Sequence, residues 1–508
     1  MSMRVGVISG YASQVYVLIL GMAFVPLYIR FMGVEAYGLV GFFTMLQAWF
    51  GVLDLGLSAT ASREATLYKN QQIDAKDFAD FCRGLAWIFG GISLLGALVL
   101  LLSAPWISHK WLVVHELQPD QVVLSVQVMA ICVALKLSGG IYRGMVTGNE
   151  WLPWLNAFNA LAATAKFAGV FLSMLIWGFS PVVFFLHQLV VGLLEWWVLW
   201  FKARTLVPVV SRRHLLQTFA AVWTRLKFML SMAFVSVVWV MVSQLDKLVL
   251  SGVLSLQDYA YFTVAMVVAN GITFLTGPVS AAVMPRMTGL YSQKSELAML
   301  TLYRKATRYL IALTGPVAAL MALYAQELLW VWTGDHNIAL HAAPVLSLYS
   351  IGNGVLAMGG FAYYLQYAKG QLRYHVLSSI LFVTLLMPAL IFAAISHGAK
   401  GAGWVWLVFN VLYLLLWVAF VHSRLAPGLH LVWLLCDGFA VILPSVALLL
   451  ICRQVFVVST LDRWLALVQL VLVCTGAMLT SLLALRDFRS MLTQKFRPAQ
   501  NSKSESSA

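Results

Sequence analysis

Charged residues are scarce in this sequence. Only 10% of its 508 residues are Asp, Glu, Lys or Arg, whereas 61% are hydrophobic. A soluble domain has about 25% charged and about 45–50% apolar residues, so this chain cannot cover itself with a polar surface in water. The composition excludes a soluble enzyme, a disordered protein and a fibre. It predicts an all-α membrane protein that crosses the bilayer many times.

Motifs for catalysis and for metal binding are also missing. The five cysteines are scattered and form no C-x-x-C pair, which favours small buried side chains over disulfides or metal ligands. The sequence contains no Walker A motif and no H-E-x-x-H motif. These absences argue against an ATP-driven pump and a metalloprotease, and we predict no catalytic residues, no metal ligands and no cofactor.

The apolar runs have the length that an α-helix needs to cross the bilayer, roughly twenty residues. We predict about fourteen transmembrane helices, with ends uncertain by several residues. Their limits are 6–29, 36–58, 84–108, 119–141, 153–177, 182–201, 229–251, 258–283, 309–332, 342–367, 376–396, 401–421, 434–452 and 464–485.

The orientation follows from Lys and Arg in the connections, which are enriched on the cytoplasmic side. One set of connections contains 25 of these residues and the other contains 5. Both termini are therefore predicted to be cytoplasmic. This asymmetry accounts for the net charge of +14 without a nucleic-acid partner. The basic loops 59–83 and 202–228 are expected to contact anionic membrane lipids.

An internal repeat relates the two halves of the chain. At a shift of about 222 residues, Arg63 matches Arg286, Gln47 matches Asn270, and Gly148 matches Gly370. Six spans in each half give a parallel repeat, typical of secondary transporters with a substrate site between two bundles. We predict two six-helix bundles around a central cleft, with two appended helices.

This repeat divides the chain into five parts. They are an N-terminal bundle (1–201), a basic cytoplasmic linker (202–228), a C-terminal bundle (229–421), two additional helices (422–485) and a cytoplasmic tail that is disordered at its end (486–508).

Polar residues on one face of the fifth span point to a lined cleft. Asn156, Asn159, Lys166 and Ser173 share a helical face, which would not be stable against lipid. Lys166 is the candidate for attracting an anionic ligand, or alternatively it pairs with a carboxylate. Gln47, on a polar stripe of the second span, and its repeat partner Asn270 join the candidate substrate-binding residues.

Other charges within the spans have two interpretations each. Asp54 is either a cleft carboxylate or a local helix cap. Glu195 is either a proton-titrating group or a partner of Lys136 or Lys166, and Lys136 is expected to extend to the interface. Asp246 and Lys247 form either cleft charges or a local pair. Asp54 and Glu195 are the candidates for H⁺ or Na⁺ coupling.

Three stretches resemble a known family. These are L-D-L-G-L-S-A-T-A-S-R-E around Asp54, the segment from Gln244 to Met266, and Y-R-G-M-V-T-G from Tyr142. They are similar to bacterial polysaccharide-transport proteins, the O-antigen flippase type of the multidrug/oligosaccharidyl-lipid/polysaccharide exporter superfamily. The resemblance covers most of residues 1–421 and includes Arg63, Arg143 and Arg286 as cytoplasmic motif residues.

The resemblance implies a flippase that moves an undecaprenyl-diphosphate-linked oligosaccharide across the inner membrane for surface polysaccharide synthesis. Other polysaccharide assembly proteins are possible partners. The alternatives are a cation-coupled multidrug exporter and a lipid II flippase of the same fold, or a membrane glycosyltransferase or polymerase. A mid-membrane lysine disfavours cationic drugs. The lack of basic residues between Val5 and Ile29 disfavours a lipid II flippase, and the short outer loops disfavour an enzyme.

Overall fold

The computed structural model describes residues 3–210, 222–455, 458–459, 462–485 and 488–489. These residues form helices joined by short turns, and the one extended pairing recorded among them is the bridge between Val113 and Ser255. The predicted tail end and the linker segment 211–221 lie outside the described residues. The helices are α1 (Met3–Met32), α2 (Val34–Phe50), α3 (Leu57–Lys69), α4 (Ala75–Trp106), α5 (Pro119–Gly148), α6 (Leu152–Thr164), α7 (Val170–Trp177), α8 (Pro181–Arg204), α10 (Leu226–Val253), α11 (Leu256–Ser292), α12 (Glu296–Leu323), α13 (Ala325–Thr333), α14 (His336–Gly359), α15 (Phe361–Ala368), α16 (Arg373–Leu412), α17 (Val418–Leu425), α18 (Leu429–Val432), α19 (Ala440–Val455) and α20 (Arg463–Ala484).

Within the described part of the chain, twelve helical segments are long and apolar enough to cross a membrane. One of them, Arg373–Leu425, contains two of the predicted spans, and the predicted seventh span, which corresponds to α10, is not among the twelve. The all-helical, multi-pass class is therefore confirmed, while the number of fourteen spans stays a prediction.

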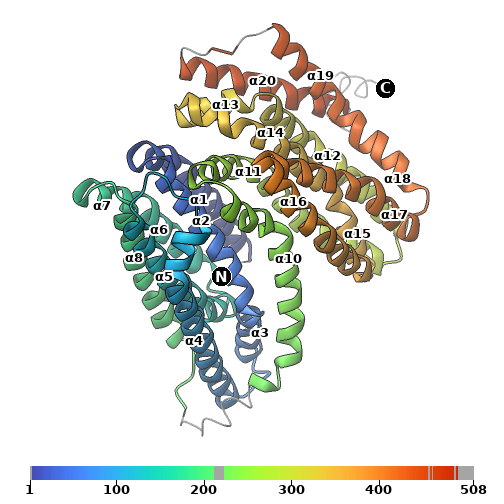
Figure 1. Ribbon diagram of the computed structural model, residues 1–508. Helices are drawn as coiled ribbons and strands as arrows, with labels where there is room; N and C mark the ends of the chain where they lie inside the picture. Colours follow the sequence, from blue (N-terminus) through green and yellow to red (C-terminus); the bar gives the residue numbers. More distant parts are fainter. Residues whose placement is uncertain (1–2, 211–221, 456–457, 460–461, 486–487, 490–508) are drawn as a thin grey trace, which may run out of the picture. The chain divides into compact units, whose positions relative to one another are not determined.

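Two compact units make up the chain, Met1–Thr263 and Val264–Ala508. In the first unit α5 has a central place, because it contacts α2, α3, α4 and α8. The helix α10 also packs against α2 and α3, as Figure 1 shows for its course beside α3. This contact places α10 in the first unit, whereas the sequence assigned 229–251 to the C-terminal bundle. The five-part division and the cleft between bundles stay predictions.

In the second unit α12 is the common support. It contacts α14 on one side and α19 and α20, the two helices that the sequence described as appended, on another. The core of this unit gathers large rings such as Tyr303, Phe361 and Trp433, all fully buried.

The second predicted span is not one continuous helix. After α2 the chain makes a tight turn, η1 (Gly51–Asp54), and Leu55 and Gly56 then adopt positive φ values of 47° and 72° before α3 begins. A left-handed conformation cannot continue an α-helix. The helix that carries Arg63 therefore starts as a separate element.

Glycine spacing in α5 explains how closely α3 approaches it. A Cβ atom at Gly144 would lie 2.4 Å from the carbonyl oxygen of Ser58, and one at Gly148 would lie 2.1 Å from that of Ser62. No residue with a side chain fits these positions without moving the backbone. The glycines thus allow α3 to pack against the part of α5 that lies past the predicted span end at 141.

Candidate functional site

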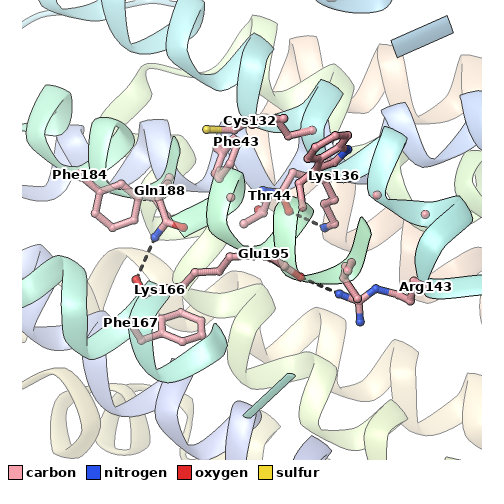
Figure 2. Close-up of a pocket in the computed structure, with 18 residues that line it drawn as sticks. Phe43, Thr44, Cys132, Lys136, Arg143, Lys166, Phe167, Phe184, Gln188 and Glu195 are labelled. Carbon is pink, nitrogen blue, oxygen red and sulfur yellow. Dashed lines mark hydrogen bonds and ion pairs between the residues drawn. The ribbon is translucent and has the colours of Figure 1, made fainter. Parts of the chain in front are cut away.

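A cavity of about 510 Å³ lies within the first unit, between α2, α5, α8 and the wide helical turn η3 (Ala165–Gly169). Figure 2 shows the side chains around it. Its polar lining consists of Thr44, Gln47, Lys136, Arg143, Lys166, Gln188 and Glu195. Aromatic rings, among them Phe43, Phe167 and Trp196, line the rest.

Glu195 of α8 is the centre of the charged side chains. Its Oε1 atom accepts a hydrogen bond of 2.6 Å from Arg143 of α5, and its Oε2 atom pairs with the ammonium of Lys166. The same guanidinium donates through its other terminal nitrogen to Oδ1 of Asn159 at 2.5 Å. The carboxylate of Glu195 thus links α8 to α5 and η3, as the dashed line between Glu195 and Arg143 in Figure 2 illustrates for α5. The guanidinium of Arg143 adds α6 through Asn159.

Lys136 lies about two helical turns before Arg143 on α5. Its ammonium donates to Oε1 of Gln47 on α2 at 2.6 Å. An amide of the cavity lining therefore binds this lysine, and its extension to the interface stays a prediction. The lining contains three cations and one carboxylate, so its formal charge is +2.

The backbone that carries Lys166 forms a wide helical turn, and side chains of other helices hydrogen-bond to its carbonyl groups. In η3 the helix widens to a π-type turn, which leaves carbonyl groups to be satisfied by side chains. Nε2 of Gln188 donates to the carbonyl of Lys166 at 2.9 Å, and the hydroxyl of Tyr28 donates to that of Phe167 at 2.7 Å. His187 contacts the carbonyl of Ala165 through Nε2 at 3.0 Å and the hydroxyl of Ser173 through Nδ1 at 2.7 Å.

These contacts fix the direction of Lys166. Donors from α1 and α8 hold consecutive carbonyls of the wide turn, so the lysine side chain leaves it toward Glu195 (Figure 2). The sequence gave no sign that Gln188 supports the backbone of Lys166.

The other predicted residues divide into those in the cavity and those outside it. Gln47, Lys166 and Glu195 line it, and Asn159 reaches it through Arg143. Arg143 lies beyond the predicted span end at 141 but still within α5, and it lines the cavity. Its role as a cytoplasmic motif residue stays a prediction.

Asn156 and Asp54 have local partners instead. Nδ2 of Asn156 donates to the hydroxyl of Ser9 at 3.0 Å, which ties α6 to α1. Oδ1 of Asp54 accepts from the backbone nitrogen of Ser58 at 3.1 Å and from its hydroxyl at 2.6 Å. Asp54 therefore behaves as a helix cap for the first turn of α3, the second of its two interpretations.

Asp246 and Lys247 on α10 form a local pair, with Nζ of the lysine 3.6 Å from Oδ1 of the aspartate. Asn270 and Arg286 are exposed on α11. Arg63 on α3 donates to Glu64 at 2.7 Å, and Glu64 also accepts from Arg225 at 3.0 Å. The binding and coupling roles of all these residues stay predictions. In the described ranges no three or more His, Cys, Asp or Glu side chains gather as a metal site would require.

Comparison with known proteins gives the family. Residues 4–290 match the family described as "Polysaccharide biosynthesis protein". The chain belongs to this family. The resemblance inferred from the sequence motifs is thereby confirmed, and the chain is a multi-pass membrane protein of polysaccharide biosynthesis.

Single relatives agree with this family. A putative O-antigen transporter of Shigella flexneri is 20% identical over 418 residues, covering 82% of this chain and 96% of that protein. Among solved structures, the lipid II flippase MurJ in an inward closed conformation has a TM-score of 0.71 at 13% identity, over 96% of this chain and 99% of that one. An inward-facing multidrug resistance MATE family transporter has a TM-score of 0.65 at 14% identity, over 82% and 96%. These structures share the fold with this family member.

Proposed function

We propose that this protein is a flippase that moves an undecaprenyl-diphosphate-linked oligosaccharide across the bacterial inner membrane by alternating access. Membership of the polysaccharide biosynthesis family, the likeness to a putative O-antigen transporter and the transporter fold support this role. No bond of the substrate is made or broken, so the residues act by binding and by differing between conformations.

The observation that carries the proposal is the charge of the cavity in the first unit. Lys136, Arg143 and Lys166 outnumber the one acidic side chain of the lining, Glu195. A diphosphate or an acidic sugar is attracted by this excess, and a guanidinium can bind phosphate oxygens with two parallel hydrogen bonds. The amide of Gln47 is suited to sugar hydroxyls. The polyprenyl chain stays in the lipid.

The same charge separates this proposal from the multidrug alternative. A cationic drug would enter a cavity whose formal charge is already +2, at an electrostatic cost. The likeness to a MATE transporter therefore supports the fold but not a cationic substrate. A lipid II flippase shares the anionic lipid chemistry, but the lack of basic residues between Val5 and Ile29 disfavours it.

The excess of Lys and Arg in one set of connections supports cytoplasmic termini. The proposal includes coupling to H⁺ or Na⁺ and contacts with other polysaccharide assembly proteins.

The decisive experiment is flipping in vesicles. Purified protein is reconstituted with a fluorescent undecaprenyl-diphosphate oligosaccharide, and the fraction reached by a membrane-impermeant quencher is followed. We expect protein-dependent exposure of the glycan, and none for an undecaprenyl-linked glycan that lacks the diphosphate. Equal flipping of both lipids, or a null strain that still exports its surface glycan but becomes drug-sensitive, would overturn the proposal.

A further inference from the structure

A second cavity, of about 310 Å³, lies in the second unit, far along the chain from the charged one. It is formed by α12, α14, η4 (Tyr413–Trp417), η5 (Trp433–Phe439) and α19. Its lining is aliphatic or aromatic apart from Thr314, whose hydroxyl already donates to the carbonyl of Leu310 at 2.9 Å. An apolar cavity without polar partners does not hold water. Its natural content in a membrane is hydrocarbon.

Small residues make the space. Gly315, Ala318, Ala319 and Ala322 of α12 line the cavity, and Gly354 and Gly438 face them from α14 and η5. A Cβ atom at Gly438 would lie 2.5 Å from Cε of Met358, and one at Gly315 would lie 2.9 Å from Cδ1 of Ile442. The part of α12 that lines the cavity, Ile311 to Leu323, has a length of about 18 Å. This matches one leaflet, about half of a 30 Å hydrocarbon core.

Charge gathers on the same face of α12, one to two turns before the cavity. Arg304 and Arg308 precede Ile311 and Gly315 at helical spacing. Arg304 binds Asp437 with two hydrogen bonds of 2.5 and 3.1 Å, and Nε of Arg308 lies 3.5 Å from the same carboxylate. Asp437 is 1% exposed, whereas the two arginine side chains are 35% and 29% exposed.

Asp437 immediately precedes Gly438, which lines the cavity. Two guanidinium groups on one carboxylate leave a formal charge of +1 at this end. The cluster therefore offers partly exposed phosphate-binding groups next to a space of acyl-chain length.

We propose that this groove binds one anionic phospholipid, with an acyl chain between α12, α14 and α19 and the phosphate at Arg304 and Arg308. Neighbouring helices with basic residues at the headgroup level are a known arrangement for anionic lipids. The site would join α19 to α12 through lipid as well as through Asp437. It does not depend on the glycan proposed to bind in the cavity of the first unit.

The test uses the full chain, stripped of lipid in detergent, with phosphatidylglycerol or phosphatidylcholine of the same chain length added back. Native mass spectrometry counts bound lipid, and thermal unfolding measures its effect. We expect tight binding of one phosphatidylglycerol and a higher unfolding temperature, with a smaller effect of phosphatidylcholine. Arg308→Gln should weaken phosphatidylglycerol roughly fivefold, the effect of one basic residue at an anionic headgroup. Arg373→Gln, an exposed arginine on α16, is the matched control.

A second variant tests the groove itself, in case Arg308→Gln disturbs folding at the arginine cluster. Ala319→Leu fills the groove from α12 and should abolish binding of both lipids, whereas Ala281→Leu on the exposed face of α11 should not. Equal binding of the two lipids by the unchanged protein, or full binding by Ala319→Leu, would overturn the proposal. Displacement of phosphatidylglycerol by undecaprenyl phosphate at equal concentration would assign the groove to a polyprenyl lipid instead.

Discussion

Arg143 of α5 and Lys166 of η3 bind the same carboxylate, that of Glu195 on α8. The arginine uses Oε1 at 2.6 Å and the lysine uses Oε2, so each carboxylate oxygen has its own cation. Glu195 occupies the place where an anionic ligand would meet both cations. The positive charge of the cavity is thereby partly neutralised, and a ligand must exchange with this carboxylate to reach the two cations.

Lys166→Gln is expected to weaken the binding of a diphosphate-linked glycan roughly ten- to hundredfold. The basis is the loss of one hydrogen bond to a charged group, about 1.5–3 kcal/mol. Binding to purified protein and flipping in vesicles measure the effect. Lys110→Gln is the control, since Lys110 is exposed in the turn after α4. If both variants bind and flip equally, Lys166 does not contact the ligand.

Gln188→Leu tests the support of the wide turn. The substitution removes the donor to the carbonyl of Lys166 and keeps a similar volume. We expect a several-fold lower ligand affinity at normal expression, and a loss of stability of about 1–3 kcal/mol for the carbonyl left without its partner. Gln188→Glu cannot donate when ionised and should also lower the ligand affinity. Gln188→Asn keeps a donor and should restore part of the affinity.

Gln257→Leu is the matched control, because Gln257 bonds Tyr261 on its own helix, away from the cavity. A stability loss in Gln188→Leu with unchanged ligand affinity would show that this contact does not position Lys166.

The sequence predicted the polar face that carries Lys166. It also gave pairing with a lysine as one of two interpretations of Glu195, and the structure pairs Glu195 with Lys166. It ended the predicted span at 141, before Arg143, because Arg143 and the glycines after it lower the hydropathy. The glycines instead serve the contact with α3, and the helix runs on to Gly148. Hydropathy cannot distinguish a loop from a tightly packed helix end.

The sequence also could not predict which side chains of distant segments contact each other. The polar stripe of span 2 contained both Gln47 and Asp54, but the left-handed turn at Leu55 and Gly56 gives them different partners. Gln47 meets Lys136, whereas Asp54 caps α3. The sequence shows which polar residues share a helical face. The turn at Leu55 and Gly56, which the sequence did not predict, determines which of them line the cavity.

Glu35 anchors the loop before α5. Its buried carboxylate accepts three backbone hydrogen bonds, from His115 at 2.6 Å, Glu116 at 2.7 Å and Leu117 at 2.8 Å. Glu35→Gln replaces one acceptor oxygen by a donor that faces N–H groups. We expect a loss of about 1.5–3 kcal/mol, seen as a lower unfolding temperature in detergent. Glu116→Gln, on an exposed side chain of the same loop, should change it little. Equal unfolding temperatures for the two variants would contradict this anchoring role.

Glu195→Gln is expected to tighten the binding of an anionic ligand, because it removes the one acidic side chain of the described cavity lining. For charges about 6 Å apart the gain is about 0.7–3 kcal/mol between a watery and a protein-like dielectric, or roughly three- to hundredfold. Turnover should fall, since release becomes slower. Binding and single-turnover flipping measure the two effects, with Asp120→Asn, an exposed carboxylate at the start of α5, as the control.

A proton on Glu195 has the same electrostatic effect as this substitution. Proton binding and anion binding at the cavity therefore favour each other, and the coupling is reciprocal. Export driven by an inward proton gradient requires the opposite sign, namely that the arriving proton weakens the ligand. We therefore expect any acceleration of export by an imposed pH gradient to survive in Glu195→Gln vesicles. Loss of that acceleration together with weaker ligand binding would make Glu195 a proton-coupling group and reverse this argument.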